Sequence, residues 1–256
     1  MIHPTALVHP GARLGPDVSI GAYSLIGEHV AIGAGTRVGS HVVITGHTRI
    51  GEGNRIFQFC SLGEEPQDKK YAGEPTRLEI GDYNVIREFC SFNTGTLQDV
   101  GVTRMGEHNW IMAYVHIAHD CQIGNHTVFA NNATLAGHVQ IGDYAILGGF
   151  TGVHQFCRVG AHAITGIASV VRQDIPPYLT VAGNPLAPFG INSEGLKRRG
   201  FSGEALAALK RAYKTLYKSG LSLADAQAAI AAEAETQPEL KLLAEFLASA
   251  GRGIVR

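Results

Sequence analysis

Residues 117–146 read, in blocks of six, IAHDCQ, IGNHTV, FANNAT, LAGHVQ and IGDYAI. Each block opens on an apolar residue, and in much of the chain the next position is glycine. The same spacing runs from Ile2 to Val171 with two interruptions, and 25 of its 26 opening positions are apolar, Thr165 being the exception. A period of six sustained over this length predicts a parallel β-helix built from hexapeptide repeats.

The repeat also predicts how each coil closes. The opening residue of a block points inward from a short strand, and glycine tolerates the positive φ of the corner that follows. Three blocks close one triangular coil of 18 residues, and successive coils stack about 4.8 Å apart. Hexapeptide coils are known to wind left-handed, against the usual crossover rule, although the sequence alone does not show the hand. We therefore expect an all-β, left-handed parallel β-helix.

All four cysteines occupy the same position, the fifth of a block, which is usually small. Cys60, Cys90, Cys121 and Cys157 have no CxxC spacing, which disfavours a zinc ribbon or a redox motif. We expect them to be buried thiols that fill a narrow core.

Two segments interrupt the repeat. Residues 63–79 are polar and rich in proline and glycine, yet Ile80 follows Leu62 by 18 residues, so the register survives. A shorter break lies near 96–102. Polar excursions from an intact framework predict projecting loops, and such loops commonly carry functional residues.

Beyond Val171 the six-residue repeat ends. Residues 174–185 are rich in proline and glycine and predict a linker, which helical patterning follows. We expect a β-helix domain over residues 1–190 and a C-terminal α-helical domain over 191–256, which covers the open end of the β-helix. Capping residues and apolar spacing predict helices over residues 203–218, 222–234 and from Pro238 onward.

Composition excludes several function classes. Lys and Arg number 21 against 22 Asp and Glu, so no strong field favours nucleic acid or an acidic membrane surface. No apolar run approaches the roughly 18 residues of a membrane span. The N-terminal residues lack the basic and apolar regions of a signal peptide. We expect a cytoplasmic protein without a nucleic-acid partner or a membrane span.

The 18-residue coil allows stacked positions to be calculated. Imidazoles that gather beside a carboxylate on a rigid wall suit general-base catalysis on a hydroxyl. Counting by 18 brings together, along one corner of the prism, His119, Asp120, Gly137, His138, His154 and Gln155.

Other functions remain open at this point. Hexapeptide β-helices include a carbonic anhydrase class, a zinc hydratase whose three histidine ligands are shared between subunits, and a non-catalytic scaffold is also possible. However, Lys70 and the basic run at 197–199 suit a phosphate or nucleotide better than a metal. We therefore favour a general base and expect no metal and no cofactor.

Five stretches of the chain resemble one family closely, the UDP-N-acetylglucosamine 3-O-acyltransferases that begin lipid A synthesis. The resemblance extends over essentially the whole chain, including the helical tail, which other hexapeptide acyltransferases lack. The stretches are QDKKYAGEPTR at 67–77, HIAHD at 116–120, ANNATLAGHV at 130–139, HQF at 154–156 and NSEGLKRRGF at 192–201.

The resemblance implies a reaction and a set of roles. A 3-hydroxyacyl chain would pass from acyl carrier protein to the glucosamine 3-position, in a homotrimer with active sites between neighbouring β-helices. His119 would be the general base, Asp120 would orient or polarise it, and the Gly137 N–H would be the oxyanion donor. Asp68, Lys70 and His116 would contact the sugar and phosphates, His138 and His154 would line the acyl and pantetheine groove, and Gln155, Asn192, Glu194, Arg198 and Arg199 would serve the nucleotide.

Two positions bear on specificity. Most members of the family have a His-Arg pair where Asn93 and Thr94 stand, so an acceptor with a 3-amine, giving an amide product, is an alternative. Ile167 occupies the family's acyl-length stop, where a bulky side chain implies a short chain, 3-hydroxydecanoyl rather than 3-hydroxymyristoyl. We expect the chain to run from Gly137 along the prism axis to Ile167; the alternative is that Ile167 points into the core.

Overall fold

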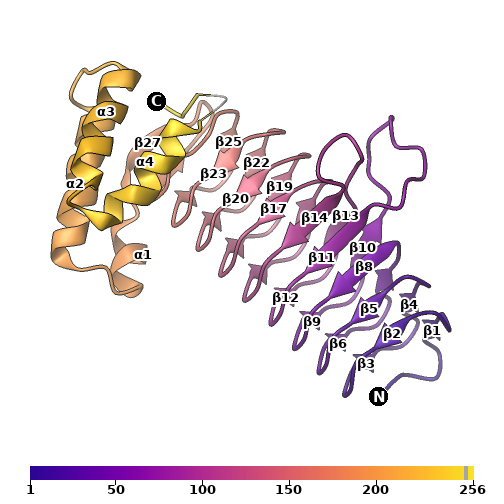
Figure 1. Ribbon diagram of the computed structural model, residues 1–256. Coiled ribbons are helices and arrows are strands. Elements are labelled where there is room, and N and C mark those ends of the chain that lie inside the picture. Colours follow the sequence, from indigo (N-terminus) through magenta and orange to yellow (C-terminus); the bar gives the residue numbers. More distant parts are fainter. Residues whose placement is uncertain (251–252) are drawn as a thin grey trace.

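The computed structural model describes residues 1–250 and 253–256, which form an elongated prism of stacked coils capped at one end by helices (Figure 1). The chain returns to the same face once per coil, so three sheets of nine, eight and ten strands make the three faces. Successive coils pair in parallel, as between β16 and β19, where Ile117 lies beside Leu135. The fold is a left-handed parallel β-helix with a C-terminal helical region, which confirms the prediction from the repeat.

We number the faces in chain order. Face I comprises β1 (Leu7–Val8), β4 (Leu25–Ile26), β7 (Val43–Ile44), β10 (Ser61–Glu64), β13 (Ser91–Asn93), β16 (His116–Ile117), β19 (Thr134–Leu135), β22 (Gly152–Val153) and β25 (Val170–Val171). Face II comprises β2 (Arg13–Leu14), β5 (Ala31–Ile32), β8 (His47–Ile50), β11 (Arg77–Ile80), β14 (Val102–Met105), β17 (Gln122–Ile123), β20 (Gln140–Ile141) and β23 (Arg158–Val159). Face III comprises β3 (Ser19–Ile20), β6 (Arg37–Val38), β9 (Arg55–Ile56), β12 (Val85–Ile86), β15 (Trp110–Ile111), β18 (Val128–Phe129), β21 (Ile146–Leu147), β24 (Ile164–Thr165), β26 (Leu179–Ala182) and β27 (Ala187–Ile191).

The opening residues of the blocks form the core of the prism. They are buried from Ile20 onward, whereas Ile2 in the first coil is 48% exposed because no coil lies beneath it. The exception, Thr165, is also buried, and its hydroxyl is satisfied by the Thr151 hydroxyl at 2.8 Å and by the Gly148 N–H at 2.9 Å. All four cysteines are buried and free, which confirms their expected role.

The glycines at the second position of the blocks have a different role from the one expected. The non-glycine residues with positive φ, from Asp17 to Ala168, all occupy the fourth position of a block. A Cβ built on Gly21 or Gly142 would lie 2.5 Å from backbone atoms of the next coil. These glycines therefore permit the close approach of stacked backbones rather than a left-handed conformation.

Many fourth-position side chains form columns of stacked rings. We name each corner by the two faces it joins. Ring centroids are 4.7 to 5.5 Å apart along corner II–III, and 4.8 to 5.2 Å along corner III–I. The first column is Tyr83, His108, His126, Tyr144, His162 and Tyr178; the second is Tyr23, His41, Phe59, Phe89 and Tyr114.

The segment expected to be a linker, 174–185, is partly a further layer of sheet. Residues 179–182 of this segment form β26, which pairs in parallel with β24. The strand that follows the segment, β27, pairs with β26 in the antiparallel direction. Buried Leu179 and Val181 extend the core of the prism here, which the proline-rich pattern concealed.

The predicted helices are confirmed, and they pack over one end of the prism (Figure 1). The side chains of Ser202 and Ser222 accept hydrogen bonds from backbone N–H groups in the first turns of α2 and α3. No helix in the described part of the chain is long and apolar enough to cross a membrane. The helices are α1 (Ser193–Arg198), α2 (Gly203–Tyr217), α3 (Leu223–Ala234) and α4 (Lys241–Ala248), with a 3₁₀ turn at Pro238–Leu240 before α4.

His162 should make the fold sensitive to acid. Its ring lies between those of Tyr144 and Tyr178, and burial together with Arg199 lowers its pKa to about 4. Between about pH 6.5 and 4 the unfolded chain therefore binds a proton that the folded chain does not, so stability falls as the pH falls. We expect His162→Asn to reduce the loss of Tm between pH 7 and pH 5. Asparagine tolerates the positive φ of this position.

The matched control for this measurement is Tyr83→Asn. It removes a ring of the same column that stacks on His108 and not on His162, and no group that titrates in this range, so the parent's pH difference should persist. A difference that is equally large in His162→Asn and in the parent would contradict the assignment.

Candidate active site

Five successive coils present their functional side chains at the same corner, I–II. The first two carry loops, of residues 65–76 between β10 and β11 and 94–101 between β13 and β14, which project on the same side of the prism (Figure 1). The expected loop over 63–79 is shorter, because its ends join strands β10 and β11. The next three coils contribute the stretches around His119, Gly137 and Gln155. Counting by 18 placed the last three of these stretches at one corner, and the structure brings them together there.

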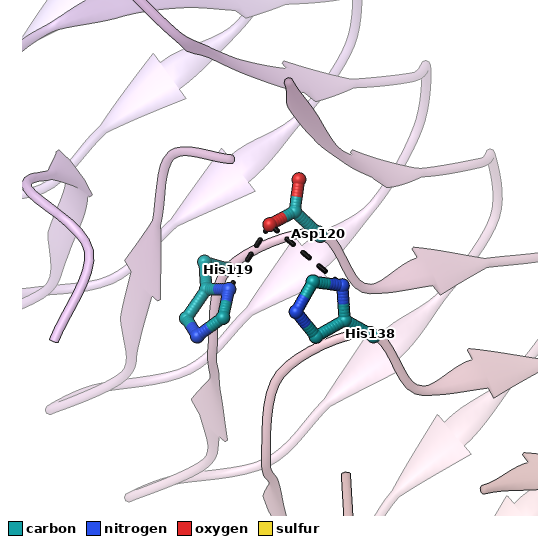
Figure 2. A group of neighbouring side chains, drawn as sticks. All are labelled: His119, Asp120 and His138. Carbon is teal, nitrogen blue, oxygen red and sulfur yellow. Dashed lines mark hydrogen bonds and ion pairs between the residues drawn. The ribbon is translucent and has the colours of Figure 1, made fainter. Parts of the chain in front are cut away.

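His119 and Asp120 form an oriented pair at this corner (Figure 2). The His119 Nδ1 lies 3.0 Å from an Asp120 carboxylate oxygen, and Asp120 is 1% exposed. The Thr96 backbone N–H lies 3.0 Å from both carboxylate oxygens, and its hydroxyl donates to one of them at 2.6 Å. Since a carboxylate can only accept, Nδ1 carries a proton, and in the tautomer that this fixes Nε2 is the proton acceptor.

The same contacts keep Asp120 ionised. Burial by itself raises the pKa of this carboxyl, but the hydrogen bonds from His119 and Thr96 outweigh it and hold the pKa below its usual value. The Thr103 hydroxyl, which accepts from the Asp120 N–H at 2.8 Å, fixes the backbone at the same point.

Gly137 lies directly over the imidazole of His119. A Cβ at this position would be 2.5 Å from Cε1 and 2.7 Å from Nε2 of His119, so no side chain fits without displacing the ring. The neighbouring N–H groups of Ala136 and His138 donate to Val153 and His119, but no group in the described residues accepts from the Gly137 N–H. One coil thus presents a proton acceptor and the next presents a free donor.

His138 is held from three sides. Its Nδ1 lies 2.6 Å from a carboxylate oxygen of Asp99, its ring stacks on Phe156 at 4.3 Å, and its edge meets the His119 ring at 4.9 Å. Donor atoms of His119, Asp120 and His138 also lie within 4.8 Å of one another, a spacing that a metal ion could bridge (Figure 2). Such an ion would compete with the Thr96 and His119 hydrogen bonds to Asp120.

A cleft of about 860 Å³ opens in front of these groups. It brings together five of the expected site residues, and within it the Lys70 N–H donates to the Asp68 carboxylate at 3.0 Å. Two lysines and four glutamines line the cleft together with the two imidazoles, a composition suited to an anionic, hydroxyl-bearing ligand. The lining residues are Gln67, Asp68, Lys69, Lys70, Gln98, Asp99, His119, His138, Gln140, Gln155 and Phe156.

Besides Asp120 and Gly137, two expected residues at the corner are not among those that line this cleft. His116 lies on β16, where its Nδ1 is 2.8 Å from the Ser91 hydroxyl, and burial lowers the pKa of its ring. His154 is exposed on the coil above Ala136.

The four expected nucleotide residues of the tail lie near a different corner. Asn192 caps α1, and its amide donates to the His162 carbonyl at 3.0 Å. Arg199 donates to the Tyr144 carbonyl and lies over the Tyr144 ring, at corner II–III. Glu194 pairs with Lys197 at 2.8 Å, and Arg198 is exposed in the last turn of α1. One chain therefore does not gather Asn192, Glu194, Arg198 and Arg199 with His119.

Ile167 also lies away from the cleft. It precedes Ala168 at corner III–I, between β24 and β25, and is 73% exposed. The alternative that it points into the core is therefore wrong. The expected route along the prism axis from Gly137 is also wrong for a single chain, because counting coils gave the height of Ile167 but ignored that it lies across face I.

Sequence analysis missed the residues that hold the site. Thr96, Thr103 and Asp99 lie in or beside an interruption of the repeat, where counting by 18 gives no position. Asn93 and Thr94, whose identity suggested a 3-amine acceptor, are buried under the 65–76 loop. Asn93 donates to the Glu65 carbonyl at 2.8 Å, and Thr94 contacts the Thr76 hydroxyl at 3.2 Å.

Comparison with known proteins agrees with this geometry. Residues 103–137 match the family model of the bacterial transferase hexapeptide (six repeats). Residues 174–255 match the model of UDP N-acetylglucosamine O-acyltransferase, domain 2. The tail and the prism thus both match families of transferases.

Whole-length relatives carry one name. The chain is 72% identical over 255 residues to the acyl-[acyl-carrier-protein]–UDP-N-acetylglucosamine O-acyltransferase of Thiobacillus denitrificans, covering 100% of this chain and 99% of the relative. It is 57% identical to the protein of the same name from Neisseria gonorrhoeae, with the same coverage. The crystal structure of the Francisella novicida UDP-N-acetylglucosamine acyltransferase matches with a TM-score of 0.99 at 45% identity, covering 100% of this chain and 94% of that one. With full-length identity far above 30% and a matching fold, the chain belongs to the acyl-[acyl-carrier-protein]–UDP-N-acetylglucosamine O-acyltransferase family.

Proposed function

We propose that this protein transfers a 3-hydroxyacyl group from acyl carrier protein to the 3-hydroxyl of UDP-N-acetylglucosamine, the first step of lipid A biosynthesis. The observation that carries the proposal is the oriented pair of His119 and Asp120 with the unpaired Gly137 N–H directly above it. General-base catalysis needs the first feature, and stabilisation of an oxyanion needs the second.

The steps follow from these positions. His119 Nε2 takes the proton of the sugar hydroxyl, and the oxygen attacks the thioester carbon. The Gly137 N–H donates to the resulting oxyanion, while Asp120 stabilises the imidazolium. The carbon–sulfur bond then breaks, and His119 returns its proton to the departing thiolate. Atoms and charges balance without a metal or a cofactor.

Substrate contacts complete the proposal. Asp68, Lys70 and His116 would serve the sugar and phosphates, and His138 and His154 the groove for acyl chain and pantetheine. Gln155 would serve the nucleotide from the cleft, whereas Asn192, Glu194, Arg198 and Arg199 would reach it from a neighbouring copy. A homotrimer that sets corner II–III of one copy beside the cleft of another satisfies this requirement. We also propose a cytoplasmic location, where both substrates would be met.

Among the alternatives, the hydroxyl acceptor is favoured over the 3-amine. The substitution of Asn93 and Thr94 suggested an amine only if these residues faced the sugar, and both are buried. The relatives are named O-acyltransferases. The test compares UDP-N-acetylglucosamine with its 3-amino analogue, using 3-hydroxyacyl carrier-protein thioesters and protein of measured zinc content. Preference for the amine, or stoichiometric zinc required for turnover, would contradict the proposal.

Removal of the base should abolish most turnover. We expect His119→Ala to lower kcat by about 10²- to 10⁴-fold, the usual contribution of a general base, with little change in UDP-sugar binding. His29→Ala is the matched control, since His29 is an exposed histidine of the same corner in an earlier coil. Near-parental turnover of His119→Ala would exclude His119 from the mechanism.

Ile167 should limit the length of the acyl chain, which favours 3-hydroxydecanoyl. Because Ile167 lies across face I from Gly137, the chain must cross that face or meet Ile167 from a second copy. Extra methylenes against this β-branched side chain cost about 1–3 kcal/mol, or roughly 5- to 150-fold in preference. Ile167→Gly should shift the donor profile toward longer chains with little loss of Tm. An unchanged profile would refute the length stop.

A further inference from the structure

The 94–101 loop contacts one imidazole of the cleft and the carboxylate that orients the other, through side chains that the proposed mechanism does not use. It arises from an insertion, since Phe92 pairs with Ile117 of the next coil 25 residues later instead of 18. Its two ends are fixed to the neighbouring coil, because the Gly95 N–H donates to the Arg77 carbonyl at 3.1 Å and the Arg77 N–H donates to Gly101 at 3.0 Å. The loop is therefore anchored to the prism at both ends.

Near its start the loop holds the first imidazole indirectly. Thr96 is 1% exposed and gives Asp120 both its N–H and its hydroxyl, and Asp120 in turn orients His119. The approach is close enough to require glycine beside it, since a Cβ on Gly95 would lie 2.7 Å from an Asp120 oxygen.

Farther along, the loop holds the second imidazole directly. The Asp99 carboxylate accepts from His138 Nδ1 at 2.6 Å, although Asp99 lies 39 residues before His138 in sequence. The Asp99 N–H donates to the Thr96 carbonyl at 3.4 Å, so one turn links the two holding residues. The Asp99 side chain is 40% exposed and that of His138 is 12% exposed, so the contact lies at the edge of the cleft.

The Asp120 and Asp99 carboxylates have the same chemical effect on the imidazole that each of them contacts. A carboxylate that accepts from Nδ1 fixes the tautomer with Nε2 unprotonated, and it also fixes the orientation of the ring. An imidazole without such a partner favours the opposite tautomer, with the proton on Nε2. The cleft thus contains two carboxylate–imidazole hydrogen bonds, one with its carboxylate from the prism and one with its carboxylate from the loop. The Asp120 carboxylate also lies 3.9 Å from His138 Nδ1, beyond hydrogen-bond distance, so Asp99 is the hydrogen-bond partner of that nitrogen.

We propose that the 94–101 loop is a positioning element of the active site, in which Thr96 acts through Asp120 on His119 and Asp99 acts through His138. This proposal rests on the proposed function for its kinetic consequences but not for the tautomer it assigns. His138 then faces the acyl and pantetheine groove as a hydrogen-bond acceptor of fixed orientation.

The kinetic test is a double-mutant cycle between Asp99 and His138. We expect Asp99→Ala to lower kcat/KM by about 10- to 100-fold, the usual cost of losing a partner that orients a functional histidine. Asp99→Asn keeps an acceptor oxygen and should lose less. Because Asp99 acts through His138, adding Asp99→Ala to His138→Gly should change kcat/KM by less than about twofold. Glycine at 138 accepts the positive φ of that position.

A control on the same loop separates positioning from folding. Val100 is 54% exposed and lies beside Asp99, so Val100→Ala should retain parental kinetics. Losses that add in the cycle, or an Asp99→Ala enzyme with parental kcat/KM, would overturn the proposal. Thr96→Val, which removes only the hydroxyl donor to Asp120, should lower kcat by about 10-fold with both KM values unchanged. A rise in KM alone would contradict its assigned role.

A spectroscopic measurement tests the assignment without turnover. In protein with ¹⁵N-labelled histidine rings, the His138 ring should carry its proton on Nδ1 in the parent and shift toward Nε2–H in Asp99→Ala. A parent with Nε2–H would overturn the proposal. A parent with the assigned tautomer but no acyl transfer would instead contradict the proposed function alone.

Discussion

The parallel backbone ladder between successive coils is the constraint on which the rest of this structure depends. Each coil donates to the next through bonds such as Ala118 N–H to Leu135 C=O, at 3.2 Å, and each return of the chain is fixed in register by them. Residues 18 apart are therefore held about 4.8 Å apart along the prism. An insertion can leave the prism only at a corner and must return in register, which is how both loops arise at corner I–II.

Close stacking also explains why the wall that carries the site is rigid. Glycine at the second position of the blocks lets backbones approach to a spacing that a Cβ would prevent, and rings stack in columns along two corners. His119 and Gly137 thus face each other across one coil step. A side chain held by packed neighbours loses little orientational freedom when a ligand binds.

The charge of Asp120 depends on the hydrogen bonds that this buried carboxylate accepts. A buried carboxylate is costly unless hydrogen bonds favour its charged form, and Thr96 with His119 supplies them to Asp120. Asp120 then determines which nitrogen of His119 carries the proton. The charge of Asp120 and the tautomer of His119 therefore depend on a loop contact that no repeat position encodes.

The sequence by itself determined the β-helix, because one apolar residue in six specifies an inward-facing strand wherever it recurs. It also determined the corner at which His119, Gly137 and His138 meet, because stacking depends only on counting by 18, and it placed the caps of the helices. Tertiary structure alone decided what the interruptions do: Thr96 and Asp99 reach their partners from a loop whose path is set by contacts distant in sequence. It likewise decided that the tail lies at corner II–III and that Ile167 lies across face I. The physical reason is that the period gives the height of a residue on the prism, whereas three-dimensional packing gives the side of the prism on which inserted and helical segments lie.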